Sequence, residues 1–421
     1  MSEPFPANLH LRCFTESPNA KPVAAQTLKI KIDEPSPWAL TFDCETTTDP
    51  SQRLRVGFYQ VRNGGSFHEE GVFFDDRVLS DSDLASVLAY AEARGLKTLS
   101  LEQFRTDVFL KVGYRLGGSI IGFNLPFDLS RLAIGHGSAR KKKFRGGFSL
   151  ILSKDKAEPR IRIKHLNRRS ALINFGKPGE QLTGRSGRKR GAQVEHCEGY
   201  FFDVKTISAA LTSRGFSLDG LCDYLQTQTQ KRQTDEHGGP ITEQYLDYAR
   251  ADVQATWECF VELRDRYAAY GLEKPLHRIL SEASIGKACL ADMGIKPLLQ
   301  CMPDIDRGIF SRLMCAYYGG RAEVKLRRLL KEVLYCDFKS MYPTVNALMG
   351  LWRFVIAGGF SWHDTTTKTQ AFLNTVTRDD LQQTETWEQL HTIVRINPQG
   401  DIVPVRAKYN GRTATIGLNH L

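Results

Sequence analysis

The first residues whose types and spacing could support chemistry are two carboxylates, Asp43 and Glu45, in the segment FDCET. The segment ends an apolar run that precedes a turn-forming stretch, so we expect a strand, and side chains two residues apart on a strand share a face. Two aligned carboxylates are able to bridge divalent metal ions. An isolated D-x-E triplet more often forms an exposed polar face, but the neighbouring Ala39, Phe42 and Cys44 indicate a strand that enters a core.

Two further segments carry acidic residues at structured positions. In GFNLPFDLSRLA, Asn124 and Asp128 stand at an expected strand-to-helix junction. Without any catalysis, Asn124 could cap the helix and Asp128 could favour its positive end. In ITEQYLDYARADVQATWECF, an amphipathic helix that Thr242 opens, Tyr248 and Asp252 are four residues apart and share a face. Taken singly, these two would be interpreted as a core tyrosine and a solvated aspartate.

In this order, the patterns D-x-E, N-x-x-F-D and Y-x-x-x-D resemble the three exonuclease motifs of DnaQ-like nucleases, which also form the proofreading domain of family B DNA polymerases. The resemblance implies a 3′–5′ exonuclease that hydrolyses single-stranded or frayed DNA 3′ ends with two Mg²⁺ or Mn²⁺ ions. Hard oxygen ligands suit these ions, and two of them about 4 Å apart stabilise the attacking and leaving oxygens of an in-line displacement.

The same resemblance assigns roles to five residues. Asp43, Glu45 and Asp252 would hold the metal ion that activates water, and Asp43 with Asp128 would hold the ion on the leaving-group side. Tyr248 and Glu45 would orient the water. All five form the expected catalytic set, and the four acids form the expected metal-binding set.

Binding of the single-stranded 3′ end is assigned by resemblance to Thr46, Asn124 and Phe127, with Phe127 as a stacking surface for a base. Protein-primed members of the family carry a lysine in a K-x-x-hydrophobic-x-A pattern before the last helix. The corresponding stretch here reads FSLDGLCDYL, and Lys205 is only a weak substitute.

Two downstream segments resemble polymerase motifs. AYYGGRAEV is similar to the Y-x-G-G loop, in which Tyr317, Gly319 and Gly320 would contact template DNA, because glycines allow close approach of the main chain to phosphate. A plain Gly-Gly turn is the alternative. LYCDFKSMYPTV resembles the first palm motif, in which Asp337, at the end of a strand, would be a metal ligand and Tyr342 would bind the incoming nucleotide.

The polymerase resemblance is incomplete. After Tyr342 the sequence has no candidate for the fingers motif K-x-x-x-N-S-x-Y-G or for the D-T-D motif, and Asp379 and Asp380 in TRDDLQQ lack a preceding strand. One palm aspartate does not hold two metal ions against a triphosphate. We therefore expect a truncated or split polymerase, of the protein-primed or plasmid-type branch, without nucleotide addition by this chain alone.

Charge and composition agree with a polyanionic partner. The net charge is +10, twelve Lys and Arg residues fall between Arg140 and Arg169, and four more fall between Arg185 and Arg190. Lys141, Lys142 and Lys143 are the expected DNA contacts within this basic stretch. The nine cysteines are scattered without a C-x-x-C pair, and no apolar run of about 18 residues occurs. A soluble, cytoplasmic protein of a nucleoid, phage or plasmid replication complex is expected.

Periodicity predicts an α/β (α+β) protein with a mixed sheet and flanking helices, which suits an RNase H-like core. Three antiparallel strands are expected at 38–46, 54–61 and 66–74, helices at 81–95 and 100–118, a strand at 119–123, and helices from about 204 to 270. Ser100 and Gln103 form an expected capping box at the start of the second helix. Further strands are expected at 148–152, 160–165, 170–175 and 200–204. The expected domains are a lead-in (1–36), the exonuclease domain (37–272, with a basic β insertion at about 138–200), and linker helices with a partial palm (273–421), whose tail we expect to form further strands.

Two other functions fit the same residues. One is a free-standing ribonuclease of the same superfamily. The other is a non-catalytic DNA-binding or scaffold subunit of a split polymerase, with the polymerase remainder, a second chain or a priming protein as its partner.

Overall fold

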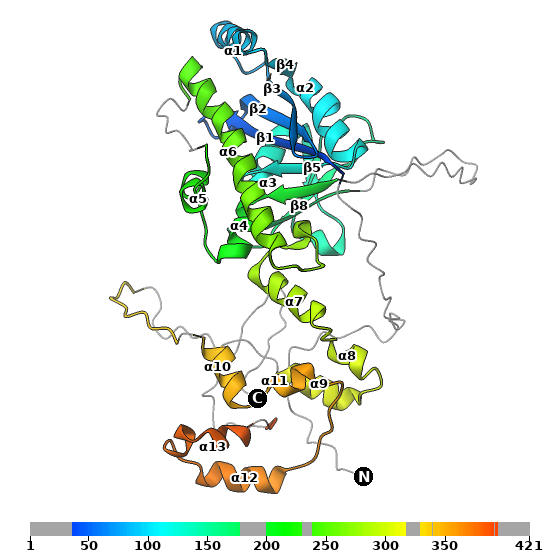
Figure 1. The fold of residues 1–421 in the computed structure, drawn as a ribbon, viewed down its shortest axis with the longest axis vertical. Helices are drawn as coiled ribbons and strands as arrows, with labels where there is room; N and C mark the ends of the chain where they lie inside the picture. Colours follow the sequence, from blue (N-terminus) through cyan, green and yellow to red (C-terminus); the bar gives the residue numbers. More distant parts are fainter. Residues whose placement is uncertain are drawn as a thin grey trace, which may run out of the picture. The chain divides into compact units, whose positions relative to one another are not determined.

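The computed structural model describes residues 36–176, 199–229, 238–316, 329–338, 340–390 and 392–394 (Figure 1). The chain divides into two units. One comprises Ile30–Asp292, and the other includes the chain from Met293 onward. In the described part of the chain, no helix is both long and apolar enough to span a bilayer.

A six-stranded mixed sheet forms the centre of the first unit, in the order β10-β5-β1-β2-β3-β4. Its strands are β1 (Trp38–Thr46), β2 (Leu54–Asn63), β3 (Ser66–Phe74), β4 (Lys97–Ser100), β5 (Ser119–Gly122) and β10 (Tyr200–Asp203). β1, β2 and β3 are antiparallel neighbours, whereas β5 runs parallel to β1 and β10 parallel to β5. The predicted meander of three strands is confirmed, and its second turn is made by Gly64 and Gly65, both with positive φ.

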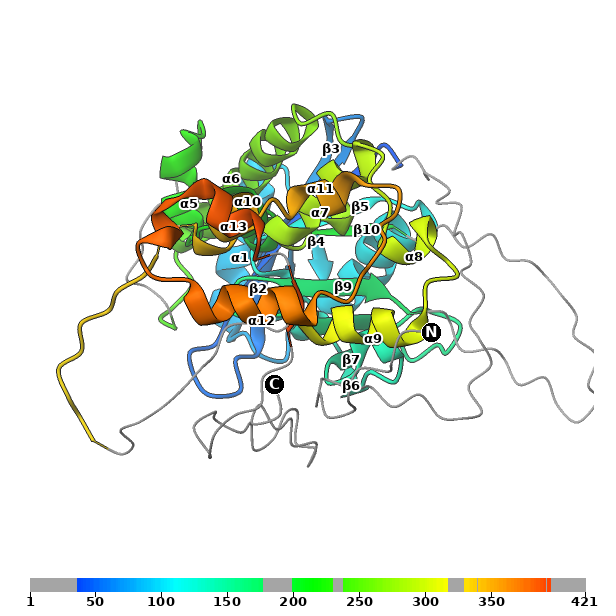
Figure 2. The same ribbon diagram turned by 90° about the horizontal axis from the view of Figure 1, so that it is seen from below.

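A second, four-stranded antiparallel sheet is formed by the basic region (Figure 2). Its strands, in spatial order, are β6 (Gly135–Ser138), β7 (Phe148–Ile151), β8 (Ile161–His165) and β9 (Ala171–Phe175). β7, β8 and β9 match predicted strands, but β6 was not expected because its sequence, GHGS, has no apolar alternation. The predicted strand at 200–204 is β10, which joins the central sheet and not this one.

The helices of the first unit are α1 (Asp81–Arg94), α2 (Leu101–Gln103), α3 (Leu125–Leu132), α4 (Val204–Thr212), α5 (Leu218–Leu225), α6 (Glu243–Ala268) and α7 (Glu282–Asp292), with 3₁₀ turns at Lys142–Phe144 and Leu276–Arg278. The long α6 crosses one face of the central sheet and contacts β1, β2 and β5 (Figure 1). α4 and α5 pack against α6.

The helix predicted at 100–118 differs in its winding. Its capping box is confirmed: the Gln103 amide donates to Ser100 Oγ, and the Ser100 amide donates to Gln103 Oε1. After one α turn the chain winds as two π segments, Phe104–Phe109 and Lys111–Arg115. Residues five apart diverge on an α-helix but align on a π-helix, so the wider turn brings both Phe104 and Phe109 into the core.

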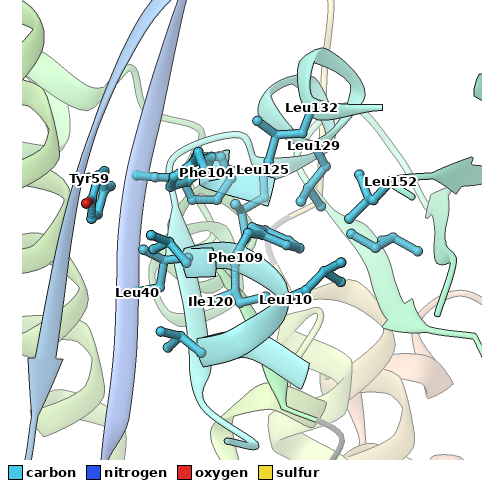
Figure 3. Close-up of a cluster of buried hydrophobic side chains, with 14 of the residues drawn as sticks. Leu40, Tyr59, Phe104, Phe109, Leu110, Ile120, Leu125, Leu129, Leu132 and Leu152 are labelled. Atoms are coloured by element: carbon cyan, nitrogen blue, oxygen red, sulfur yellow. The ribbon is translucent and has the colours of Figure 1, made fainter. Parts of the chain in front are cut away.

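The core beside these π segments fixes the position of α3 (Figure 3). Leu40 and Ile120 reach it from the sheet, Phe109 from the first π segment, and Leu110 from the position between the two π segments. α3 contributes its apolar face, namely Leu125, Leu129 and Leu132. Burial of several large side chains, at about 1.5–3 kcal/mol each, holds the short α3 against the sheet.

In the second unit the described elements are helical. They are α8 (Leu298–Cys301), α9 (Arg307–Ala316), α10 (Met341–Leu348), α11 (Trp352–Ile356), α12 (Thr366–Thr375) and α13 (Thr384–Glu388), with a 3₁₀ turn at Asp380–Gln382. The strand expected before Asp337 is wrong: the described residues 329–338 have no regular structure. Their large apolar side chains, such as Leu334 and Tyr335, are almost fully exposed, so no packing supports a strand there. The strands expected in the tail lie outside the described residues.

Candidate metal centre

Three carboxylates from two elements meet at one end of the central sheet. Leu40, Phe42 and Cys44 on β1 belong to the core beside the π segments, and the alternation of the strand therefore turns Asp43 and Glu45 toward α6. One ligand oxygen from each of Asp43, Glu45 and Asp252 lies within 4.8 Å of the others. Asp43 and Glu45, which were predicted to share one face of the strand, thus lie against the predicted helix that carries Asp252.

Helix α6 is placed by its own sequence. Thr242 caps it, accepting a hydrogen bond from the Tyr245 amide at 3.1 Å, as the amphipathic pattern predicted. Small residues on its buried face, Ala249 and Ala255, allow close approach to the sheet. Asp252 lies on this face and is only 2% exposed.

A tyrosine one turn before the predicted one contacts the carboxylates. The Tyr245 hydroxyl donates to Glu45 Oε2 at 3.0 Å. Burial raises the pKa of Tyr245, and the adjacent Glu45 raises it further, so the hydroxyl stays protonated as a donor. Tyr248 is also buried, and its ring stacks at 6.2 Å from that of Tyr245. Sequence reasoning missed Tyr245, although its spacing of seven residues from Asp252 places both on one helical face.

Asp128 adds a fourth carboxylate. It lies on α3 and is 2% exposed. Burial raises the pKa of Asp128 well above its usual range, and the charges of Asp43, Asp203 and Glu45 raise it further. Within the described part of the chain, its Oδ2 has no hydrogen-bond partner. A buried carboxylate oxygen without a donor is unfavourable unless a cation compensates it, and an all-oxygen set of this kind fits Mg²⁺ or Mn²⁺.

The start of α3 is held by Asp203, which the sequence did not single out. The Asn124 and Leu125 amides donate to Asp203 Oδ1 at 2.9 and 3.1 Å, and Thr206 Oγ1 donates to its Oδ2 at 2.5 Å. The alternative in which the Asn124 side chain caps the helix is wrong, because that side chain makes no capping hydrogen bond and the residue has a φ of 68°. Lys205 Nζ donates to Asn124 Oδ1 at 3.3 Å.

No family model and no curated protein matches the sequence. Among solved structures, the chain is similar to Phi29 DNA polymerase complexed with single-stranded DNA, with a TM-score of 0.32 and 12% identity. The similarity covers 67% of this chain and 40% of that one, so this chain spans less than half of the polymerase. A likeness of this size does not by itself assign a function.

The predicted nucleic-acid contacts fall into three groups. Thr46, Asn124 and Phe127 are half-buried beside the carboxylates, at the end of β1, at the start of α3 and on α3, respectively. Lys141, Lys142 and Lys143 are exposed in the loop between β6 and β7. Tyr317, Gly319 and Gly320 lie outside the described residues, and Asp337 and Tyr342 are exposed in the second unit.

Proposed function

We propose that this chain is a metal-dependent 3′–5′ exonuclease of the proofreading type, acting on single-stranded or frayed DNA 3′ ends. The observation that carries the proposal is the cluster of Asp43, Glu45 and Asp252, with ligand oxygens within 4.8 Å, together with the buried, electrostatically coupled Asp128. Four carboxylates at this density repel one another, and divalent cations neutralise that repulsion.

Two bound divalent ions would supply the charge that stabilises the attacking and leaving oxygens of a phosphodiester. Asp43, Glu45 and Asp252 are the proposed ligands on the attacking side, and Asp43 with Asp128 on the leaving side. The Tyr245 hydroxyl fixes the orientation of the Glu45 carboxylate through their hydrogen bond. We keep Tyr248 as the proposed partner of Glu45 in orienting water.

The wider assignment is part of the same proposal. A sheet in which three antiparallel strands are followed by three strands parallel to the first, namely β4, β5 and β10, supports an RNase H-like domain at 37–272. The exposed lysines 141–143 support a DNA partner. We propose that residues 273–421 belong to a partial palm of a family B polymerase. A primer-template, a polymerase remainder or second chain, and a priming protein are the proposed partners.

The test uses the purified full chain, a 5′-labelled single-stranded DNA and a matched RNA, with Mn²⁺ or with EDTA. We expect stepwise shortening of the DNA that EDTA stops. Asp43→Ala with Glu45→Ala should abolish shortening with DNA binding retained, whereas Asp223→Ala, which removes an exposed carboxylate on α5, should have no effect. Degradation by the double variant would refute the site. Preferential degradation of the RNA would favour the alternative of a free-standing ribonuclease. A DNA strand that stays intact would favour the alternative of a non-catalytic scaffold subunit.

A further inference from the structure

A groove of about 700 Å³ lies beside the metal centre, between α3 and the second sheet. Along α3, Leu125, Asp128 and Leu129 are buried, whereas Phe127 and Arg131 line the groove. One short helix therefore presents a carboxylate to the metal centre on one face and an aromatic–cationic pair to the groove on the other. The volume is within the range of about 300–1,000 Å³ that is usual for ligand sites.

The second wall of the groove is one face of the four-stranded sheet. His136 on β6 pairs in register with Leu150 on β7, and Phe148 on β7 pairs with Ile163 on β8, so these side chains stand beside one another. Phe148 is 54% exposed. A large solvent-exposed ring beside apolar side chains offers a surface on which another flat ring can stack.

The groove is positively charged. Among the described residues, its lining includes Arg131, His136 and His165 and no carboxylate. The Arg131 guanidinium lies 4.7 Å over the Phe127 ring and donates to backbone carbonyls at Ser51 and Gln52, which fixes its position at the rim. The loop between β6 and β7 adds three exposed lysines, at 141–143. Such a surface is complementary to a chain of phosphates and not to a basic or purely apolar partner.

We propose that this groove binds single-stranded nucleic acid, holding the nucleotides that precede the terminal one. Phe148 stacks on an unpaired base, and Arg131, His136 and His165 face the phosphates. An unpaired strand fits because aromatic platforms stack exposed base faces, which a duplex keeps covered. The direction of the strand, with its 3′ end at the metal centre, rests on the proposed function, whereas binding in the groove does not.

The binding test is fluorescence anisotropy of the full chain with a fluorescein-labelled oligothymidylate in EDTA. Phe148→Ala should weaken binding about 5- to 150-fold, the range for loss of one base–aromatic stack. Phe148→Trp should retain it. The matched control is Phe67→Ala, which removes another exposed strand phenylalanine, on β3, and should change nothing. Arg131→Gln should lower the slope of log K against log salt by about 0.7, as expected for one phosphate contact on a single strand.

The hydrolysis test separates this inference from the proposed function. The p-nitrophenyl ester of thymidine 5′-monophosphate reaches only the metal centre, so Phe148→Ala should leave its turnover unchanged and raise KM for the oligonucleotide. If Phe148→Ala weakens binding but the wild-type chain cleaves neither substrate, the exonuclease proposal is refuted and the groove proposal stands. Unchanged binding and KM in Phe148→Ala would overturn the groove alone. Dissociation of a dimer by this variant, seen in light scattering, would overturn it in favour of a second copy of the chain.

Discussion

Replacing Asp128 by Asn tests the metal centre without any substrate. The carboxyl is 2% exposed, and its pKa is raised by burial first and by the charges of Asp43 and Asp203 next. No described residue donates a hydrogen bond to its Oδ2. In the metal-free protein the charged form of Asp128 is therefore unfavourable, and Asn has nearly the same shape without the charge. We expect Asp128→Asn to be more stable than the wild type when metal is absent.

The size of the effect follows from the buried charge, because Asn keeps a polar atom at this position and removes only the charge. A buried group without a partner destabilises by about 1–3 kcal/mol, and a charged group by at least this amount. For a domain of this size each kcal/mol shifts Tm by roughly 2–4 °C, so the variant should melt roughly 2–12 °C higher. The folded-state pKa lies above the unfolded value, so the penalty on the wild type is complete above the folded pKa and disappears as the pH falls toward 3.8. The gain should be present at pH 8 and absent near pH 4.

The assay is thermal unfolding of both proteins in EDTA and then with Mg²⁺ or Mn²⁺. A ligand at 100 times its Kd stabilises by about 2.7 kcal/mol. The wild type should gain this stability with metal, and the variant should gain clearly less. Asp223→Asn, a change of an exposed carboxylate, should behave like the wild type. A variant that melts lower than the wild type in EDTA at pH 8, or that gains equally from metal, would refute the reasoning.

Two other side chains give sharp expectations. Tyr245→Phe removes the hydrogen bond to Glu45, which at about 1.5–3 kcal/mol should lower kcat about 10- to 100-fold at constant KM; an undiminished kcat would contradict this. Burial lowers the pKa of His277 to about 4, so the unfolded state takes up this proton first and stability falls as the pH drops from 6.5 to 4. Because His277 is only half-buried, His277→Phe should reduce that loss by about 1 kcal/mol in urea titrations; an identical pH dependence would argue against it.

Features fixed by neighbouring residues could be predicted from the sequence. The alternation in β1 predicted both the strand and the common face of Asp43 and Glu45, because side-chain direction on a strand depends only on spacing. The caps at Ser100 and Thr242 were predicted for the same reason, since each is a contact between residues three apart. These local rules do not depend on which element packs on which.

Features decided by packing could not be predicted. Periodicity places Tyr245 and Tyr248 on one face of α6, but it does not show that the Tyr245 hydroxyl reaches Glu45, because that depends on the depth at which the helix lies on the sheet. Asp203 looks like an ordinary strand-end residue until β10 lies beside β5, which brings it to amides 78 and 79 residues away. The π winding at Phe104 is likewise selected by the core that it fills.

Two buried aspartates differ in whether neighbouring groups of the protein compensate their charge. Burial raises the pKa of both Asp203 and Asp128. Asp203 is compensated by two backbone amides and a threonine hydroxyl, and in return it fixes the start of α3. Asp128, on that same helix, keeps an oxygen without a donor and faces other carboxylates. Stability alone would favour an apolar residue or a donor at that position, and a divalent cation is the partner that makes a carboxylate there favourable.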